Sequence, residues 1–324
     1  MSARATGVGS MPGEDMTASV RLLLDVVPDF LHLPELPDRG TIADMTGRAA
    51  AMVAELGFDL QPAGWRLIDA PGVDHRRARS LLAQDLDVLE EQAQGYAGPL
   101  KVQVAGPWTI ASTIEKPRGD KVLSDVGARR DLAQALAEGV RTHLDDVRRR
   151  VPEARLVLQL DEPALPFVLA GQVPTASGFN RHRSVRPPDA SEALAWVLAA
   201  AGEVETVVHC CAADAPIALL RGAGAAAVSV DLGVLVAAAY DDLATVLDEG
   251  GSVHLGVLPS SGRSAPDTGA VIDRVRRVLE MIGFDPAEVL DQLVLTPACG
   301  LAGSSASYTR AALAAVHEAA RELG

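Results

Sequence analysis

Apolar and polar positions divide this chain into two kinds of segment that alternate. Short runs rich in Val, Leu and Ile are separated by longer stretches in which Ala, Leu and Arg recur at helical spacing. The apolar runs lie at 29–34, 65–70, 101–107, 155–163, 206–212, 226–233, 252–259 and 293–300. Helical spacing is clearest at 129–150, 191–201 and 308–323. This alternation is typical of a parallel sheet wrapped by helices.

Eight such units predict a closed (β/α)₈ barrel, the TIM-barrel fold, as a single domain over residues 1–324. An open doubly wound sheet produces a similar alternation, but no glycine-rich dinucleotide turn is apparent. The glycine- and alanine-rich stretch 221–227 precedes a strand, so we interpret it as a helix end and not as a phosphate loop. The segment 171–188 predicts a long loop at the barrel face that carries active sites.

The composition narrows the classes of partner. The chain has 324 residues, 48% of them hydrophobic, with 29 Lys and Arg against 43 Asp and Glu and a formal net charge of -14. This charge opposes broad attraction to nucleic acid or anionic lipid, so small-molecule partners are expected. Three cysteines are too few for the disulfide framework of a secreted domain. With neither a secretory leader nor an apolar run of membrane length, we expect a soluble, cytoplasmic protein.

The cysteines fall at the ends of two predicted strands. Residues two apart in a strand point to the same side, so His209 and Cys211 face together and Cys210 faces away. Cys299 lies near the carboxyl end of the last apolar run, at the barrel face where active sites are built. Imidazole and thiolate are ligands that zinc prefers. We therefore predict a Zn²⁺ site formed by His209, Cys211 and Cys299.

A fourth zinc ligand is predicted at Asp231, which ends the strand that follows the His-Cys strand. A carboxylate is easier for a substrate to displace than a thiolate. The alternative is that the cysteines are small buried apolar residues and that His209 is a satisfied core histidine. The joint placement of all three cysteines at two strand ends, one of them two residues from a histidine, favours the metal.

Two further segments carry candidate groups for binding a substrate. Asp161 and Glu162 end the fourth apolar run and point to opposite faces. One carboxylate at a barrel mouth can bind an ammonium group, and the compatible alternative is a helix N-cap. Gly9 and Ser10 offer backbone amides and a hydroxyl to a carboxylate. The common sequence motifs of hydrolases, nucleotide hydrolases and metalloproteases are not found.

Four short motifs occur in order along the chain: Gly9-Ser10, Asp161-Glu162-Pro163-Ala164, His209-x-Cys211 and Pro297-x-Cys299-Gly300-Leu301. Their order and spacing resemble the catalytic domain of cobalamin-independent methionine synthase, over nearly the whole chain. The resemblance implies a barrel whose zinc is held by the His-x-Cys pair, the distant cysteine and a carboxylate, and accepts the sulfur of homocysteine. It also implies that Asp161 and Ser10, with Gly9, hold the ammonium and carboxylate groups of that amino acid.

The chain departs from that family in three ways. The full-length enzymes carry a second, N-terminal barrel, so this chain resembles the short, single-barrel form. The family's zinc carboxylate is usually glutamate, whereas Asp231 is one methylene shorter. The family's proton-donating histidine after the seventh strand has no counterpart in residues 258–262, which read Leu-Pro-Ser-Ser-Gly.

The resemblance implies a zinc-dependent methyltransferase that converts homocysteine to methionine, with His209, Cys211 and Cys299 as its catalytic metal ligands. The expected methyl donor is methyltetrahydrofolate or a methylated corrinoid protein. Two alternatives stay open. One is alkyl transfer to another thiol such as coenzyme M, against which Asp161 argues because a carboxylate repels a sulfonate. The other is a zinc- and homocysteine-binding sensor without turnover.

Overall fold

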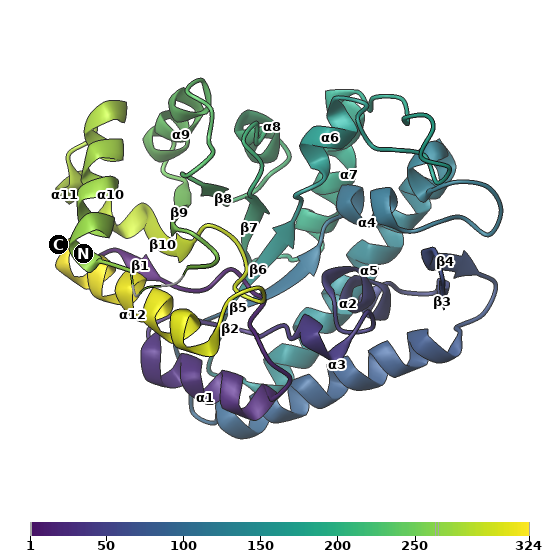
Figure 1. The fold of residues 1–324 in the computed structure, drawn as a ribbon, viewed down its shortest axis with the longest axis horizontal. Helices are drawn as coiled ribbons and strands as arrows, with labels where there is room; N and C mark the ends of the chain where they lie inside the picture. Colours follow the sequence, from purple (N-terminus) through teal and green to yellow (C-terminus); the bar gives the residue numbers. More distant parts are fainter. Residues whose placement is uncertain (1, 263, 265, 324) are drawn as a thin grey trace.

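Eight parallel strands form the central sheet of the computed structural model, which describes residues 2–262, 264 and 266–323 (Figure 1). Their order in the sheet is β1-β10-β9-β8-β7-β6-β5-β2, so neighbours in the sheet largely follow the chain. The bounds are β1 (Arg4–Ala5), β2 (Leu31–His32), β5 (Pro99–Ala105), β6 (Arg155–Asp161), β7 (Glu205–Cys210), β8 (Ala227–Asp231), β9 (Ser252–Leu258) and β10 (Leu293–Pro297).

The two outer strands of this order, β1 and β2, are joined just beyond their ends. Ser10 and Glu35 form a parallel β-bridge. The amide of Met11 donates to the carbonyl oxygen of Glu35 at 2.8 Å, and the amide of Glu35 donates to the carbonyl oxygen of Gly9 at 3.2 Å. The sheet therefore closes on itself at the carboxyl ends of the strands. The predicted (β/α)₈ barrel is confirmed.

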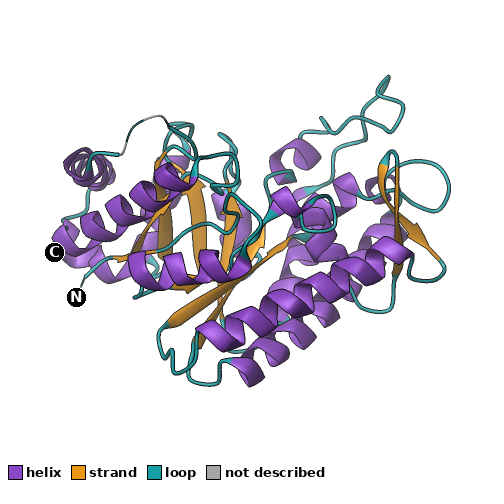
Figure 2. Ribbon diagram, turned by 60° about the horizontal axis from the view of Figure 1, so that its bottom comes forward, coloured by secondary structure: helices purple, strands orange, loops and turns teal. Residues whose placement is uncertain are grey.

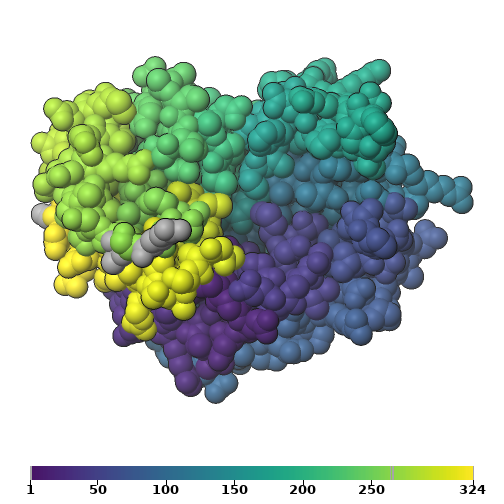
Figure 3. Space-filling model, in the orientation of Figure 1, coloured from purple at the N-terminus to yellow at the C-terminus, as the bar shows by residue number. Residues whose placement is uncertain are grey.

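Helices surround this barrel (Figure 2). They are α1 (Met16–Val26), α2 (Met45–Met52), α3 (Val73–Gln92), α4 (Pro107–Thr113), α5 (Val126–Arg150), α6 (Leu165–Leu169), α7 (Pro187–Ala199), α8 (Ile217–Gly222), α9 (Ala239–Asp248), α10 (Thr268–Ile282), α11 (Pro286–Val289) and α12 (Ala306–Glu322). Short 3-10 turns lie at Pro37–Arg39, Val122–Ser124 and Leu290–Gln292. The first and last segments of the chain lie side by side, as the adjoining purple and yellow residues in Figure 3 show. Strand β1 contacts β10, and helix α1 contacts α12.

One predicted strand does not belong to the barrel. The run 65–70 corresponds to β4 (Gly64–Ile68), which pairs antiparallel with β3 (Gly57–Gln61) in a separate hairpin. In β4 only Trp65 is buried, as expected for a strand outside the central sheet. The eighth barrel strand is instead β1, whose two residues are too few to show a period of hydrophobicity in the sequence.

The loop and helices expected from the sequence are present with shifted bounds. Residues 170–186 connect α6 to α7 without a helix, which confirms the long loop. Helix α7 begins at Pro187, four residues before the expected start, because proline is well suited to the first helical turn. Helices α5 and α12 begin three and two residues early, at positions where Asp125 and Ser305 provide side-chain N-caps.

The interior of the barrel changes from apolar to polar toward the carboxyl ends of the strands. A small cluster near the amino ends consists of Phe30, Val157, Val207, Ala227 and Val294. Two residues further along their strands come the buried polar side chains of Gln159, His209, Ser229 and Thr296. Barrel interiors are commonly filled by branched apolar residues, so this polar layer indicates a specialised interior beneath the mouth.

Among the helices that the structure describes, none combines the length and the apolar character needed to span a bilayer.

Candidate metal centre

Three side chains with soft or borderline donor atoms meet at the mouth of the barrel. His209 lies in β7, Cys211 follows that strand directly, and Cys299 lies two residues beyond β10. Two strands, β8 and β9, separate β7 from β10 in the sheet, and the curvature of the closed barrel brings their ends together. One ligand atom from each of the three residues lies within 4.8 Å of the others.

The two thiols are unbridged and lie close to each other. The Sγ atoms of Cys211 and Cys299 are 3.5 Å apart, and the thiol of Cys299 donates a hydrogen bond to that of Cys211. This bond lowers the pKa of Cys211 and, with burial, raises the pKa of Cys299. Two sulfurs that each lie about 2.3 Å from a tetrahedral zinc ion are about 3.8 Å apart. The distance between these two sulfur atoms is therefore close to that of two thiolates bound to the same zinc ion.

The imidazole of His209 is oriented by the neighbouring strand. Its Nδ1 lies 2.9 Å from the hydroxyl Oγ of Ser229 in β8. Its Nε2 is buried and has no hydrogen-bond partner among the described residues. A metal-binding histidine commonly uses one ring nitrogen for the ion and the other for an orienting hydrogen bond. The orphaned Nε2 and the two nearby thiols form a donor set that fits zinc.

Cys210 lies apart from this group, in the main apolar core. Burial raises the pKa of its thiol to about 12, so it is not a ready thiolate donor. The alternation along β7 thus separates the two adjacent cysteines, as the strand period predicts.

Asp231, the predicted fourth ligand, does not join the His209, Cys211 and Cys299 group among the described residues. Its Oδ1 accepts a hydrogen bond of 2.6 Å from the backbone amide of Gly233, which holds the carboxylate on its own loop. The structure thus brings together three of the four predicted zinc ligands. Zinc binding by Asp231 stays a prediction from the sequence.

A cavity of about 270 Å³ opens beside the three candidate ligands. It lies at the carboxyl ends of β1, β2, β6, β7 and β10, the face where barrel enzymes bind their substrates. It is lined by Val8, Gly9, Ser10, Glu35, Pro37, Ala43, Asp44, Met45, Asp161, Pro163, His209, Cys211, Cys299 and Gly300. All three candidates for substrate binding, Gly9, Ser10 and Asp161, therefore share one cavity with the three candidate metal ligands.

Ser10 is held against the loop that carries Cys299. Its carbonyl accepts a hydrogen bond of 2.7 Å from the amide of Leu301. A Cβ atom on Gly300 would lie only 1.9 Å from the hydroxyl oxygen of Ser10, so a side chain at Gly300 would displace that hydroxyl. The glycine after Cys299 thus allows the first and last barrel strands to present Ser10 and Cys299 together.

The two acids at the end of β6 have different surroundings. Asp161 lines the cavity, and burial raises its pKa while the charge of His209 opposes that shift. Glu162 is fully buried on the other side of the strand and accepts hydrogen bonds from the amides of Trp108 and Thr109 at 2.9 and 2.8 Å. Glu162 therefore binds amides at the amino end of α4, and neither acid is the N-cap of the helix that follows β6, because the N-cap residue of α6 is Ala164. The ammonium-binding role of Asp161 stays a prediction.

Glu35 is a cavity residue that the sequence analysis missed. It is buried, pairs with Nε of Arg48 at 3.4 Å, and has a pKa that burial raises to about 7. A signal was present, because Glu35 directly follows the apolar run 29–34 and so stands at the carboxyl end of a predicted strand. It adds a second carboxylate to the wall of the cavity.

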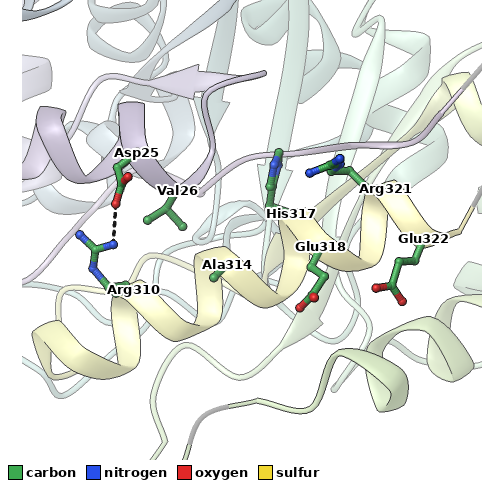
Figure 4. A pocket seen from close by; sticks show the side chains of 8 residues that line it. All are labelled: Asp25, Val26, Arg310, Ala314, His317, Glu318, Arg321 and Glu322. Atoms are coloured by element: carbon green, nitrogen blue, oxygen red, sulfur yellow. Dashed lines mark hydrogen bonds and ion pairs between the residues drawn. The ribbon is translucent and has the colours of Figure 1, made fainter.

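A separate hollow lies between α1 and α12 and contains none of the predicted site residues (Figure 4). Its charged side chains include Asp25 and Arg310, which form an ion pair at 2.6 Å. Both side chains are more than half exposed, so the hollow is a solvated surface between helices.

Comparisons with known proteins agree with this fold. A B12-independent methionine synthase from Shewanella sp. W3-18-1 in complex with selenomethionine has a TM-score of 0.65 and 14% identity, covering 100% of this chain and 98% of that chain. A tryptophan synthase complex from Pyrococcus furiosus matches with a TM-score of 0.44 and 13% identity, covering 99% of this chain and 98% of that chain. GH5_18 from Streptomyces cattleya, in complex with GlcNAc, matches with a TM-score of 0.47 and 16% identity, covering 99% of this chain and 80% of that chain. Only the Shewanella structure bears on the fold, and at 14% identity its likeness concerns the fold alone.

The sequence comparisons identify the family. No curated protein matches the chain. Residues 92–322, which contain Asp161 and all three candidate metal ligands, match the family described as cobalamin-independent synthase, catalytic domain. The chain therefore belongs to the cobalamin-independent methionine synthase family, in its catalytic domain.

Proposed function

We propose that this protein is a zinc-dependent methyltransferase that transfers a methyl group to the thiol of homocysteine and forms methionine. The observation that carries the proposal is the convergence of His209, Cys211 and Cys299 beside a cavity of amino-acid size. Family membership supports methyl transfer of the methionine synthase type. We propose further that residues 1–324 act as one catalytic barrel domain.

The chain's own groups have distinct roles in this proposal. His209, Cys211 and Cys299 hold zinc, and Ser229 orients the imidazole. A bound zinc ion lowers the pKa of a coordinated thiol, so that sulfur can act as a nucleophile near neutral pH. Methyl transfer to sulfur is an in-line displacement, so the protein's main task is to orient the thiol.

The cavity wall matches the two charged groups of an amino acid. Asp161 and Glu35 supply negative charge for the ammonium group, while Gly9 and Ser10 supply an amide and a hydroxyl for the carboxylate. Two buried carboxylates disfavour a thiol that carries a sulfonate, because like charges repel in a cavity of low polarity. Homocysteine is therefore a better acceptor for this cavity than coenzyme M.

Methyltetrahydrofolate and a methylated corrinoid protein are the proposed methyl donors. The match to the Shewanella methionine synthase covers 100% of this chain and 98% of that chain, so the two chains are similar in length. Of these two donors, the folate is the less favoured. Its activation would need a proton from a histidine after the seventh barrel strand, β9, and residues 258–262 contain no histidine.

The proposal is tested by turnover of the zinc-loaded protein with homocysteine and, in separate reactions, methyltetrahydrofolate and methylcobalamin. We expect methionine with at least one donor, loss of product after zinc is removed by a chelator, and recovery when zinc is restored. Binding isotherms for homocysteine and coenzyme M form the second readout. Tighter binding of coenzyme M would change the acceptor, and tight homocysteine binding without product from any donor would favour the sensor.

Gly300→Ala is expected to weaken homocysteine binding, because the new methyl group would occupy the place of the Ser10 hydroxyl. A displacement of this kind raises the KM for homocysteine about tenfold or more. Gly303→Ala is the matched control, since no described atom lies within 4 Å of a Cβ at that position. Steady-state kinetics of the two variants decide the point, and equal KM values would show that Ser10 does not contact the substrate.

A further inference from the structure

A lysine is enclosed in the barrel beneath the proposed substrate cavity. Lys101 lies in β5 and its side chain has no solvent exposure. A buried ammonium group is costly unless it is paired or fully hydrogen-bonded, and lysine is among the residues least often found inside proteins. An apolar side chain would fill this space at lower cost, so the retained charge indicates a specific use.

All three N–H groups of the ammonium have an acceptor. Nζ of Lys101 donates to the carbonyl oxygens of Gly7 at 2.7 Å and Val8 at 3.1 Å, and to Oε1 of Gln159. An ammonium group has three donors, so its hydrogen-bonding capacity is used completely. The first two bonds hold the backbone that leads directly into Gly9 and Ser10.

Gln159 extends the same network to the other side of the cavity. Its Oε1 accepts from Lys101, which leaves its Nε2 as the donor group. Nε2 donates to the carbonyl of Val8 at 2.9 Å and to Oδ1 of Asp161 at 2.7 Å. Lys101 is therefore linked both to the segment that ends in Ser10 and, through Gln159, to Asp161.

The geometry points to Lys101 as a positioning residue that, together with Gln159, sets the distance between the carboxylate-binding and ammonium-binding sides of the amino-acid site. This inference rests on the proposed function, since it assigns those two sides to homocysteine. Lys101 does not line the cavity, so it acts through Gly9, Ser10 and Asp161 and not by touching the substrate.

Burial and the nearby carboxylates act on the pKa of Lys101 in opposite directions. Burial lowers the pKa of Lys101 to about 7, whereas the carboxylates of Asp161 and Glu35 oppose this shift. His32 and His254 are the other buried titratable groups whose pKa the charge of Lys101 affects, and burial is the main reason that both pKa values lie well below normal. The two cavity carboxylates are thus the groups that favour the ammonium form.

The first test compares Lys101→Met with the parent, both loaded with zinc, in binding of homocysteine and of 1-propanethiol. Propanethiol carries the thiol without the ammonium and carboxylate groups. We expect Lys101→Met to weaken homocysteine binding about tenfold or more, as a misplaced pair of binding groups does. Zinc content and propanethiol binding are expected to stay at the parent's values, because the hydrogen bonds of Lys101 go to Gly7, Val8 and Gln159 and not to the three metal ligands.

Gln159→Met separates the two branches of the network. It removes the bond to Asp161, together with the bonds of Gln159 to Lys101 and to the carbonyl of Val8, but leaves Lys101 with the carbonyl oxygens of Gly7 and Val8. We expect this variant to reduce the preference for homocysteine over 4-mercaptobutyrate, which lacks the ammonium group. The preference for homocysteine over 3-aminopropanethiol, which lacks the carboxylate, is expected to change less. This variant also tests the inference if Lys101→Met does not fold.

His254→Leu is the matched control for disturbance of the barrel interior. His254 is fully buried in β9, packs edge-on against Phe30, and makes no side-chain hydrogen bond to the described residues. We expect it to change stability without changing the ratio of homocysteine to propanethiol affinity. The inference would be overturned if the ratio of homocysteine to propanethiol affinity were unchanged in both Lys101→Met and Gln159→Met. It would also be overturned if His254→Leu lowered this ratio as much as those two variants do. Failure of the proposed function is distinguished by a parent that binds homocysteine no better than propanethiol.

Discussion

Replacing Cys299 or Cys211 by serine is expected to lower the zinc content from about one ion per chain to near zero, because a single structural or catalytic site needs its thiolates. A serine hydroxyl is not ionised near neutral pH and is a poor replacement for a thiolate donor. Methionine formation is expected to fall below detection in both variants. Metal analysis of the purified proteins, prepared under reducing conditions, is the measurement.

Cys210→Ser is the matched control for this experiment. Cys210 is adjacent to Cys211 in the chain but lies in the apolar core, so its replacement is expected to leave zinc bound. A buried hydroxyl without a partner costs about 1–3 kcal/mol, so this variant is expected to unfold at a lower temperature than the parent. Zinc loss in Cys210→Ser, or full zinc in Cys299→Ser, would contradict the assignment. Asp231→Asn, measured beside them, decides whether the carboxylate is a fourth ligand.

Asp161→Asn is expected to raise the KM for homocysteine about 10- to 100-fold, which is the usual weight of a hydrogen bond to a charged group. The substitution keeps the shape of the side chain and removes the charge that the ammonium group would contact. Binding isotherms and steady-state kinetics, with zinc content measured in parallel, test this expectation.

The substrate itself provides the control for Asp161→Asn. Binding of 4-mercaptobutyrate, which has no ammonium group, is expected to be unchanged or improved, because a carboxylate no longer repels its anionic end. An equal loss for homocysteine and 4-mercaptobutyrate would show that Asp161 supports the structure of the site and does not bind the ammonium group.

The sequence predicted the features of the site that depend on local geometry. The two-residue period of a strand separates Cys211 from Cys210, and parallel strands of a barrel end at one face, which brings the segments of His209 and Cys299 to the same mouth. The long loop before α7 and most barrel strands follow from the same periodic patterns. Each of these patterns can be recognised from residues that lie a few positions apart in the chain.

Contacts between distant segments could be decided only by the tertiary structure. The closure of the barrel by Ser10 and Glu35, the turn of Asp231 toward Gly233, and the burial of Lys101 leave no periodic trace in the sequence. A single lysine in an apolar run does not reveal its hydrogen-bond acceptors, which here lie 58 to 94 positions away in the chain. Periodicity tells which side a residue faces, whereas packing of the closed barrel decides what it meets there.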